Sequence, residues 1–545
     1  MMAHPSIRPY INQAYLLGLL MVVVGLTLSP FLMGMSQFWL ILVWIADGIV
    51  TKDFKAKLHR FWHNKAAVLL AAFYLMHVVG LLWTSDFQYA LKDLRVKLPV
   101  LVLPFVLSGM EPLDRKRFDF VMLVYVLSVF VATQFSFVSY LRHDYEDIRE
   151  ISRFISHIRF CLNIVFSMAV IGYYLYRMRA SKSNGVPNFG LKVVLNHFLM
   201  WFMLLWFACM VFILESLSGY VVLAAVAIVS AVYAFLQWKK SRGWHIAVGL
   251  AALTILVVGI VIVVHFVKPM LRVEPVDFAI LEKKTAQGND YWHDTVFNPV
   301  EDGKYVGLYY CKKEMQEAWP KRSSMPLDGT TTNGENLEAT LARYLTSKNL
   351  RKDAQGVMAL TDEDVHNVEQ GVANYNNWQH PGLHARLSST LFEYNLYRRY
   401  NNPNGGSLSQ RIEFTRASFH IIRQHPWFGV GTGDVPQAFA QTYEEILSPL
   451  NEEYRFRAHN QYLAVAVAFG LVGLAFFLFV LFYPWLASKR NHSYLYMVFL
   501  CIMLLSMFPE DTLETQAGAT LFAFFVALLL FARPKTGAIS SDEIL

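Results

Sequence analysis

Charged residues and cysteines are both scarce in this chain of 545 residues. Lys, Arg, Asp and Glu together make up only 16% of it, too few for one soluble domain of this size. The four cysteines are far apart in the sequence, which excludes a disulfide framework and a CxxC metal site. A cleavable signal peptide is not evident either, because the first apolar stretch, 15–34, is a full-length span without a small-residue cleavage pattern.

Apolar residues are abundant instead. The chain is 55% hydrophobic and 15% aromatic, with a mean hydropathy of +0.34. Stretches such as 221–236 and 250–264 are almost continuously apolar, as helices that cross about 30 Å of hydrocarbon are. The composition therefore predicts an all-α polytopic membrane protein.

Twelve apolar stretches are candidate transmembrane helices. They are 15–34, 36–50, 66–83, 98–110, 119–140, 158–176, 198–215, 219–237, 246–267, 459–487, 494–508 and 520–533. An even number of spans places both termini on one side of the membrane.

Basic residues predict which side that is. The connections 52–65, 115–117, 177–192, 239–242 and 489–490 are basic, contain few acids and fall on one side of the membrane in this arrangement. The positive-inside rule assigns them, and both termini, to the cytoplasm. The net charge of +7 thus reflects membrane topology and not nucleic-acid binding.

One long hydrophilic block, 268–457, separates the ninth span from the tenth and is expected to face outward. Apolar spacing predicts helices at 336–350 and 409–422, and Thr361 followed by acids predicts a helix start. Residues 401–406 read as a loop. We therefore expect three parts: transmembrane helices 1–9 in 1–267, a mainly helical outer domain in 268–457, and helices 10–12 with a cytoplasmic tail in 458–545.

A set of motifs closes this block. It consists of Arg411, the segment HPWFGVGTGD at 425–434, AHNQYL at 458–463, and a following span that contains Gly470 and Gly473. As a set, it resembles the O-antigen ligase and polymerase superfamily of bacterial envelope glycosyltransferases. The outer block, at 285–291 and 341–356, resembles that of O-antigen ligase proteins of Bacteroidota type.

The resemblance implies a GT-C-like enzyme of the bacterial inner membrane, with its active site facing the periplasm. Such enzymes take a glycan from undecaprenyl pyrophosphate, and for this chain the implied acceptor is the lipid A-core of lipopolysaccharide. No cofactor and no metal are expected. The same chemistry would also serve an O-antigen polymerase or a protein O-oligosaccharyltransferase, and a lipid-linked glycan transporter is the non-enzyme alternative.

Two residues are the first candidates for the chemistry. Arginine binds a pyrophosphate through bidentate, charge-assisted hydrogen bonds, so Arg411 is expected to stabilise the leaving group. An imidazole can accept the proton of the attacking hydroxyl at neutral pH, so His459 is expected to act as the general base of an inverting transfer. The alternatives are a helix anchor for His459 and a salt bridge from Arg411 to Glu413 or Asp434.

Further basic residues could complete a pyrophosphate site, since cations at the outer edge of spans need anionic partners. The alternative for each of these residues is a role as an anchor at the membrane interface. These candidates are Arg95, Lys97, Arg159, Arg416 and Arg457.

The remaining motifs favour structural roles. Gly429, Gly431 and Gly433 lack the strand–loop–helix context of a phosphate loop, so a tight turn is expected there. Glu510 and Asp511 could orient His459 or an arginine, but we favour a solvated loop pair. The acidic runs 144–147 and 362–364 read as helix starts or solvated charge and not as metal ligands.

Overall fold

The structure, a computed structural model, describes residues 7–142, 148–183, 197–237, 272–487 and 493–533, together with residues 261, 265 and 268. The chain divides into two compact units. Unit 1 comprises Met1–Ala252, Phe414–Ile446 and Arg455–Leu545, and unit 2 comprises Leu253–Glu413 and Leu447–Tyr454. Residues 414–446, part of the hydrophilic block, thus belong with the apolar helices of unit 1.

All regular secondary structure in the described residues of unit 1 is helical. Its elements are α1 (Arg8–Leu28), α2 (Pro30–Thr51), α3 (Phe54–His63), α4 (Lys65–Val79), η1 (Gly80–Trp83), α5 (Phe87–Lys97), α6 (Pro99–Gly109), α7 (Arg115–Arg142), η2 (Ile148–Ile151), α8 (His157–Ser183), α9 (His197–Ile213), α10 (Leu217–Gln237), α20 (Val435–Glu445), α21 (Gln461–Ala487), α22 (Tyr494–Ser506), η8 (Thr512–Glu514), α23 (Gln516–Ala527) and the π-helical η9 (Leu528–Ala532). Helix α19 (Ser407–Gln424) begins in unit 2 and belongs to unit 1 from Phe414 onward.

Among the described residues, seven helices are long and apolar enough to cross a membrane. They are Arg8–Leu28, Pro30–Thr51, Lys65–Trp83, Arg115–Arg142, His157–Met178, Leu217–Ala234 and Gln461–Ala487. This confirms the prediction of a multi-pass helical membrane protein. Four further predicted spans correspond to the shorter helices α6, α9, α22 and α23, and the predicted span 246–267 falls almost entirely outside the described residues. The total of twelve spans, and their orientation, stay predictions.

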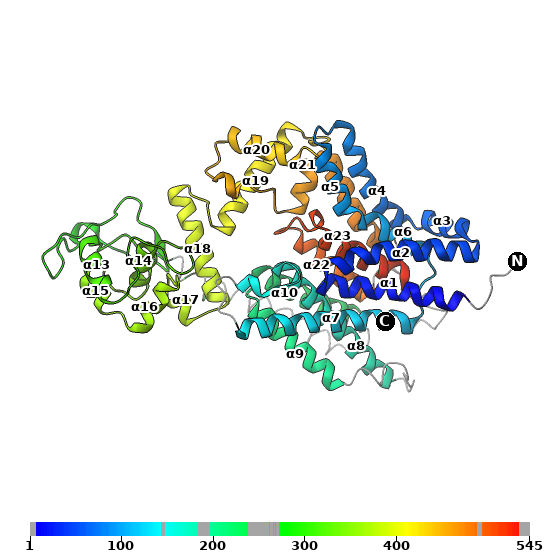
Figure 1. Cartoon of the computed structure of the whole chain (residues 1–545), viewed down its shortest axis with the longest axis horizontal. Helices are drawn as coiled ribbons and strands as arrows, with labels where there is room; N and C mark the ends of the chain where they lie inside the picture. Colours follow the sequence, from blue (N-terminus) through cyan, green and yellow to red (C-terminus); the bar gives the residue numbers. More distant parts are fainter. Residues whose placement is uncertain are drawn as a thin grey trace. The chain divides into compact units, whose positions relative to one another are not determined.

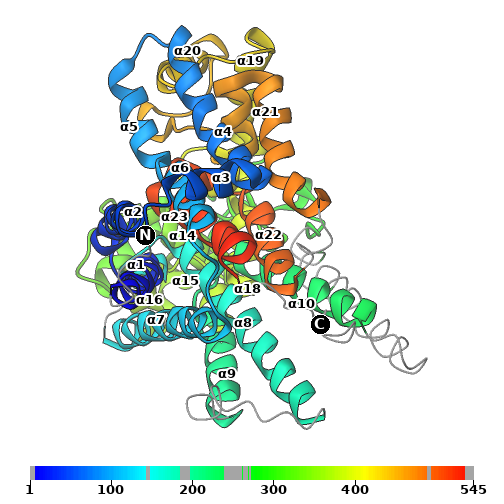
Figure 2. The same ribbon diagram turned by 90° about the vertical axis from the view of Figure 1, so that its right-hand side faces the viewer.

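Local sequence sets the ends of these helices. Ser29 ends α1 in an extended conformation, its hydroxyl accepts a hydrogen bond from Leu32 N at 3.2 Å, and Pro30 occupies the first position of α2. The resulting hairpin packs against α7, while α6 contacts α4 and α23 (Figure 2). Fully buried side chains such as Val22, Tyr125 and Phe522 fill the space between the helices.

Helix α21 is interrupted at Gly470, which has φ 65° and ψ −166°. A loop from residue 426 to residue 431 supplies the missing backbone partners. Leu471 N donates to Pro426 O at 2.7 Å, and the amides of Val430 and Gly431 donate to carbonyls of residues 467 and 468 at 3.0 and 2.9 Å. The loop therefore completes the hydrogen bonding that the break removes from the helix.

Unit 2 combines helices (Figure 1) with one small β-hairpin. Its elements are η4 (Phe278–Ile280), β1 (Val300–Glu301), β2 (Lys304–Tyr305), α13 (Lys312–Ala318), η5 (Trp319–Lys321), α14 (Leu337–Ser347), α15 (Ala354–Met358), α16 (Asp362–Glu369), α17 (Tyr375–Gln379), α18 (Leu383–Tyr400), the start of α19, and η6 (Glu452–Tyr454). Strands β1 and β2 pair in antiparallel orientation and are connected by a two-residue turn, Asp302 and Gly303, in which both residues have positive φ. Trp319, Leu341 and Tyr344 are fully buried in its hydrophobic core.

The helices expected in the hydrophilic block are present. Helix α14 occupies the predicted 336–350 region, and α19 covers 409–422. Thr361 caps α16, where it forms a reciprocal capping box with Asp364. The acidic run 362–364 is thus a helix start, whereas the run 144–147 lies outside the described residues.

We predict that Gly470→Ala destabilises the protein, because a Cβ atom there would lie 2.3 Å from the Trp427 carbonyl group and the backbone is in the left-handed region. The expected loss is about 1–3 kcal/mol, measured as a lower thermal unfolding midpoint in detergent. Gly172→Ala in α8 is the matched control, since nothing lies within 4 Å of its added Cβ. Equal midpoints for the two variants would contradict the role of the break.

Candidate functional site

His459 lies just before the first turn of α21. Asn460 caps that helix, because its side-chain oxygen accepts a hydrogen bond from Leu463 N at 3.0 Å. His459 itself has a left-handed backbone, with φ 44°. Its ring packs between Phe414 and Phe456, with centroid separations of 5.5 and 6.1 Å, and 36% of its side chain is exposed. The imidazole is thus held by aromatic packing and remains accessible.

The loop after α22 is tied to the same helix start. Gln461 N donates to Met507 O at 2.9 Å, and the Gln461 side-chain oxygen accepts from Leu513 N at 2.6 Å. Asn460 Nδ2 donates to Phe508 O at 2.9 Å. These bonds fix the position of the loop beside His459.

Asp511 in this loop faces the imidazole. Its Oδ1 lies 3.8 Å from His459 Nδ1, which is close enough for an electrostatic interaction but too long for a hydrogen bond. Only 6% of the Asp511 side chain is exposed. The prediction that Asp511 belongs to a solvated loop pair is therefore wrong for this residue: the bonds from Asn460 and Gln461 hold its loop against α21.

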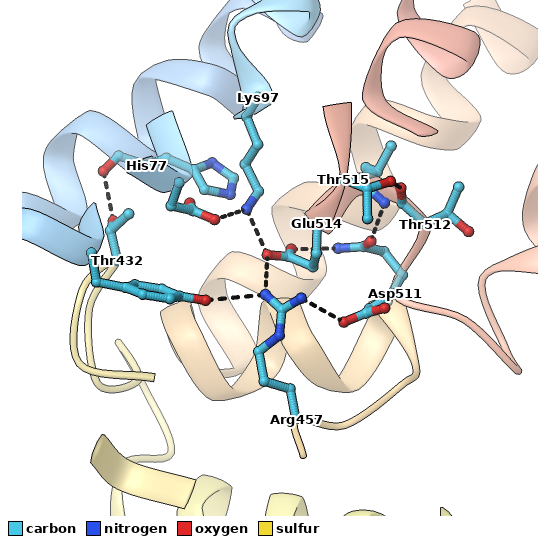
Figure 3. A network of polar contacts seen from close by, with 12 residues as sticks. His77, Lys97, Thr432, Arg457, Asp511, Thr512, Glu514 and Thr515 are labelled. Atoms are coloured by element: carbon cyan, nitrogen blue, oxygen red, sulfur yellow. Dashed lines mark hydrogen bonds and ion pairs between the residues drawn. The ribbon is translucent and has the colours of Figure 1, made fainter. Parts of the chain in front are cut away.

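Arg457 joins Asp511 to a second carboxylate (Figure 3). Its guanidinium lies 3.1 Å from Asp511 and 3.3 Å from Glu514, and it donates to Tyr89 Oη at 3.1 Å. Burial alone would lower the pKa of Arg457, but the two carboxylates raise it above its ordinary value. Burial raises the pKa of Asp511 despite this cation.

Lys97 neutralises the other side of Glu514 (Figure 3). The buried ammonium lies 2.7 Å from the Glu514 carboxylate and also pairs with Asp93, one turn earlier in α5. Burial alone would raise the pKa of Glu514, but Lys97 and Arg457 lower it to about 2. Burial raises the pKa of Asp93 to about 6, against the effect of Lys97. The network is a chain of alternating charges, and its stability depends on all of its members.

A small pocket adjoins this network and is lined by His77, Tyr89, Phe439 and the charged groups themselves. Its volume of about 20 Å³ suits a water molecule and not a sugar ring. The charged groups bind one another, and these contacts hold the loop and Asp511 in place.

The glycine segment packs against α21 and against the corner between α4 and α5. Gly429 and Gly431 have φ of 65° and 93°, and a Cβ at Gly429 would lie 2.4 Å from the backbone of α21. Thr432 donates to His77 O at 2.7 Å (Figure 3), and Gly433 N donates to Thr84 Oγ1 at 3.1 Å. These amides serve a tight turn, as the absence of a phosphate-loop pattern suggested.

Asp434 follows this turn and anchors it to the start of α5. Its carboxylate accepts hydrogen bonds from the backbone amides of Ser85 at 2.9 Å and Asp86 at 2.8 Å. The alternative in which Asp434 pairs with Arg411 therefore has no support in these contacts. The turn therefore links α21 to the corner between α4 and α5, and α5 carries Lys97 at its other end.

Among the other basic candidates, Arg159 interacts with the loop that carries Asp511. It is in the first turn of α8, donates to Ser156 Oγ at 3.1 Å and interacts electrostatically with Glu510 and Asp511. Its Nε is buried and has no hydrogen-bond partner among the described residues. An anion is the natural ligand for such a group.

The remaining candidates are more dispersed. Arg95 is exposed on α5, and Arg416 is exposed on α19 with Nη2 3.4 Å from Ile446 O. Arg411 lies in the part of α19 that belongs to unit 2, so its convergence with His459 stays a prediction. Lys97, enclosed by two carboxylates, does not present its charge to a ligand.

One group of side chains could approach a metal ion. The ligand atoms of His459, Glu510 and Asp511 lie within 4.8 Å of one another. Arg457 already neutralises Asp511, which weakens the set as a cation site.

Sequence reasoning missed three members of the site: Asp93, Gln461 as a loop anchor, and Glu514. The spacing of Asp93 and Lys97, four residues apart on one helix, was a usable signal for their ion pair. Glu514 gave no such signal, because its partners are 57 and 417 residues away in the sequence.

Residues 371–478 match the protein family described as O-antigen ligase. The chain contains an O-antigen ligase domain. This confirms the resemblance seen in the motifs and the classification as an enzyme of that family. The O-antigen ligase domain includes Arg411, the glycine segment and His459, whereas Arg159 and the 507–514 loop come from outside it. No curated protein matches the chain.

We predict that Lys97→Met destabilises the protein by about 3–5 kcal/mol, because it leaves Glu514 and Asp93 buried with less compensating charge. Thermal unfolding in detergent measures this loss. Lys92→Met on the same helix is the control, since Lys92 is exposed and its replacement should change stability by no more than about 0.5 kcal/mol. A similar effect of both substitutions would show that Lys97 is not part of a stabilising network.

Glu514 should also make stability depend on pH. A carboxylate whose pKa is lowered by folding stabilises the protein fully when the pH is above its ordinary, unfolded pKa. This stabilisation is lost as the pH falls through the pKa of the folded state. The stability difference between the wild type and Glu514→Gln should therefore shrink between pH 4.5 and about 2. Unfolding of both proteins across this range measures the effect, with exposed Glu111→Gln as control. A constant difference would contradict the assignment.

Proposed function

We propose that this protein transfers a glycan from undecaprenyl pyrophosphate to an acceptor hydroxyl, with the lipid A-core of lipopolysaccharide as acceptor. The observation that carries the proposal is His459: an accessible imidazole held between two aromatic rings and facing a buried carboxylate, inside an O-antigen ligase domain. A helix anchor would require neither the left-handed backbone nor the fixed Asp511.

In the proposed reaction, His459 is the general base. Asp511 faces Nδ1 and favours a proton on that nitrogen, so Nε2 accepts the proton of the attacking hydroxyl. The acceptor oxygen forms a bond to the anomeric carbon while the bond from that carbon to the phosphate oxygen breaks. The electron pair leaves with the pyrophosphate, so the anomeric configuration inverts. The Asp511 carboxylate then stabilises the imidazolium.

The leaving pyrophosphate needs cations. Arg411 remains our first candidate. Arg159 is the second, because its buried Nε has no hydrogen-bond partner in the part of the chain that the structure describes and its charge acts on the Asp511 loop. Arg95 and Arg416 are exposed and could contact the donor at the surface of the protein. Arg457 is a positioning residue in this scheme, since its charge is shared by two carboxylates.

The proposed location follows from the same chemistry. The pyrophosphate of a polyprenyl donor lies at the boundary between lipid and water, while its tail stays between helices. We propose twelve spans in the bacterial inner membrane, cytoplasmic termini, and a periplasmic domain over 268–457. The basic connections on one side support this orientation.

We predict that His459→Ala lowers glycan transfer by at least about 100-fold without loss of donor binding, because only proton transfer is removed. The assay uses purified protein, lipid-linked glycan and acceptor, with bound donor measured separately. His366→Ala, an exposed histidine of α16, is the control and should retain activity. Undiminished transfer by His459→Ala would refute the general base, and transport of donor without transfer in the wild type would favour a transporter.

The same assay tests the metal-free mechanism and the acceptor. Transfer should continue in EDTA, because arginines neutralise the leaving group. Loss of activity in EDTA, restored by a divalent ion, would instead assign that ion to His459, Glu510 and Asp511. Lipid A-core, growing glycan and serine- or threonine-containing peptide are offered in parallel, and the one that is glycosylated decides between ligase, polymerase and protein transferase.

A further inference from the structure

Unit 2 contains a pocket that the proposed reaction does not use. It is lined by Asn289, Asp290, Trp292, Tyr310, Cys311, Lys312 and Lys313. Its volume of about 420 Å³ lies within the range of small-molecule sites, roughly 300–1,000 Å³. All of these residues belong to unit 2.

An exposed indole forms the apolar part of the pocket. Trp292 is 60% exposed, which is uncommon for so large an apolar side chain. Its backbone is fixed to that of Tyr310 by two hydrogen bonds, of 2.8 and 3.0 Å, and the two rings are perpendicular with centroids 6.1 Å apart. The indole therefore presents an aromatic face at a defined angle to a second ring.

The second ring is held from behind. Tyr310 Oη donates to Glu338 at 2.5 Å, and Lys312 Nζ donates to the other oxygen of that carboxylate at 2.8 Å. Glu338 thus fixes the position of both the Tyr310 ring and the Lys312 ammonium group.

The polar side of the pocket is equally fixed. Asn289 Nδ2 donates to Glu314 Oε1 at 2.8 Å, and Glu314 is buried. Lys313 Nζ lies 3.4 Å from Asn289 Oδ1, and exposed Asp290 pairs with Lys284 at 2.8 Å. The lining of the pocket thus includes an amide, a carboxylate and two ammonium groups beside the two aromatic rings.

We propose that this pocket binds a saccharide ring of the glycan that the enzyme handles, an inference that rests on the proposed function. One face of a pyranose carries C–H bonds that pack on the electron-rich face of an indole. Its rim carries hydroxyl groups, each of which both donates and accepts hydrogen bonds, so it can pair with the amide, carboxylate and ammonium groups of the pocket. A peptide or lipid would need a larger apolar surface than two rings provide.

The saccharide could come from the donor or from the acceptor, so two probes are needed. One is the lipid-free glycan released from the undecaprenyl donor, and the other is core oligosaccharide released from the acceptor lipid. Each is titrated into the full-length protein in nanodiscs by calorimetry. We expect one of them to bind about tenfold more weakly to Trp292→Ala than to the wild type, and Trp292→Phe to restore part of that loss.

Phe278→Ala is the matched control, since Phe278 is an exposed aromatic of unit 2 that packs on Tyr305 and does not line the pocket. In the transfer assay, Trp292→Ala should raise KM for the bound partner and leave kcat unchanged. A partner truncated to its single reacting sugar should have the same KM with the wild type and with Trp292→Ala, because no sugar remains to occupy the pocket.

The two proposals fail separately. If the wild type binds neither probe, or if Trp292→Ala binds both probes as the wild type does, the saccharide site is refuted and the His459 results stand. If His459→Ala transfers glycan normally while Trp292→Ala weakens binding, the proposed base fails and the saccharide site stands.

Discussion

The arrangement of the site depends on one buried carboxylate. Glu514 forms ion pairs with Lys97 on one side and with Arg457 on the other. Without these two cations, burying its negative charge would strongly destabilise the folded protein. Because Glu514 ends the short η8 helix, its neutralisation also fixes the preceding residues. Asp511 is thereby held beside His459, so this charge network determines the surroundings of the proposed base.

Three separate stretches of the chain meet at this point. Helix α5 supplies Lys97, the segment before α21 supplies Arg457 and His459, and the loop after α22 supplies Asp511 and Glu514. The glycine segment adds a fourth connection, since it bonds to α21 and through Asp434 to the start of α5. A reactive side chain at the end of a helix gains a defined position from such cross-links, which a single helix cap would not give.

Sequence reasoning could reach the parts of this protein that depend on local pattern. Long apolar runs predicted the helices, the Thr361 cap predicted α16, and the motif at 458–463 identified His459. Contacts between residues far apart in the sequence could not be predicted in this way. Lys97 looked like a cation available to a phosphate, because nothing near it in sequence indicates that Glu514 shares its charge. The break in α21 was equally hidden, since glycine is common in unbroken membrane helices.

The same break has a consequence for how the protein is made. Residues 426–431 leave the ribosome before α21 does, yet they supply the backbone partners that its interrupted middle requires. When that helix enters the lipid, its unpaired amides and carbonyls must find this loop already close by. We therefore expect the loop to dock while α21 inserts, because each segment satisfies the backbone groups of the other.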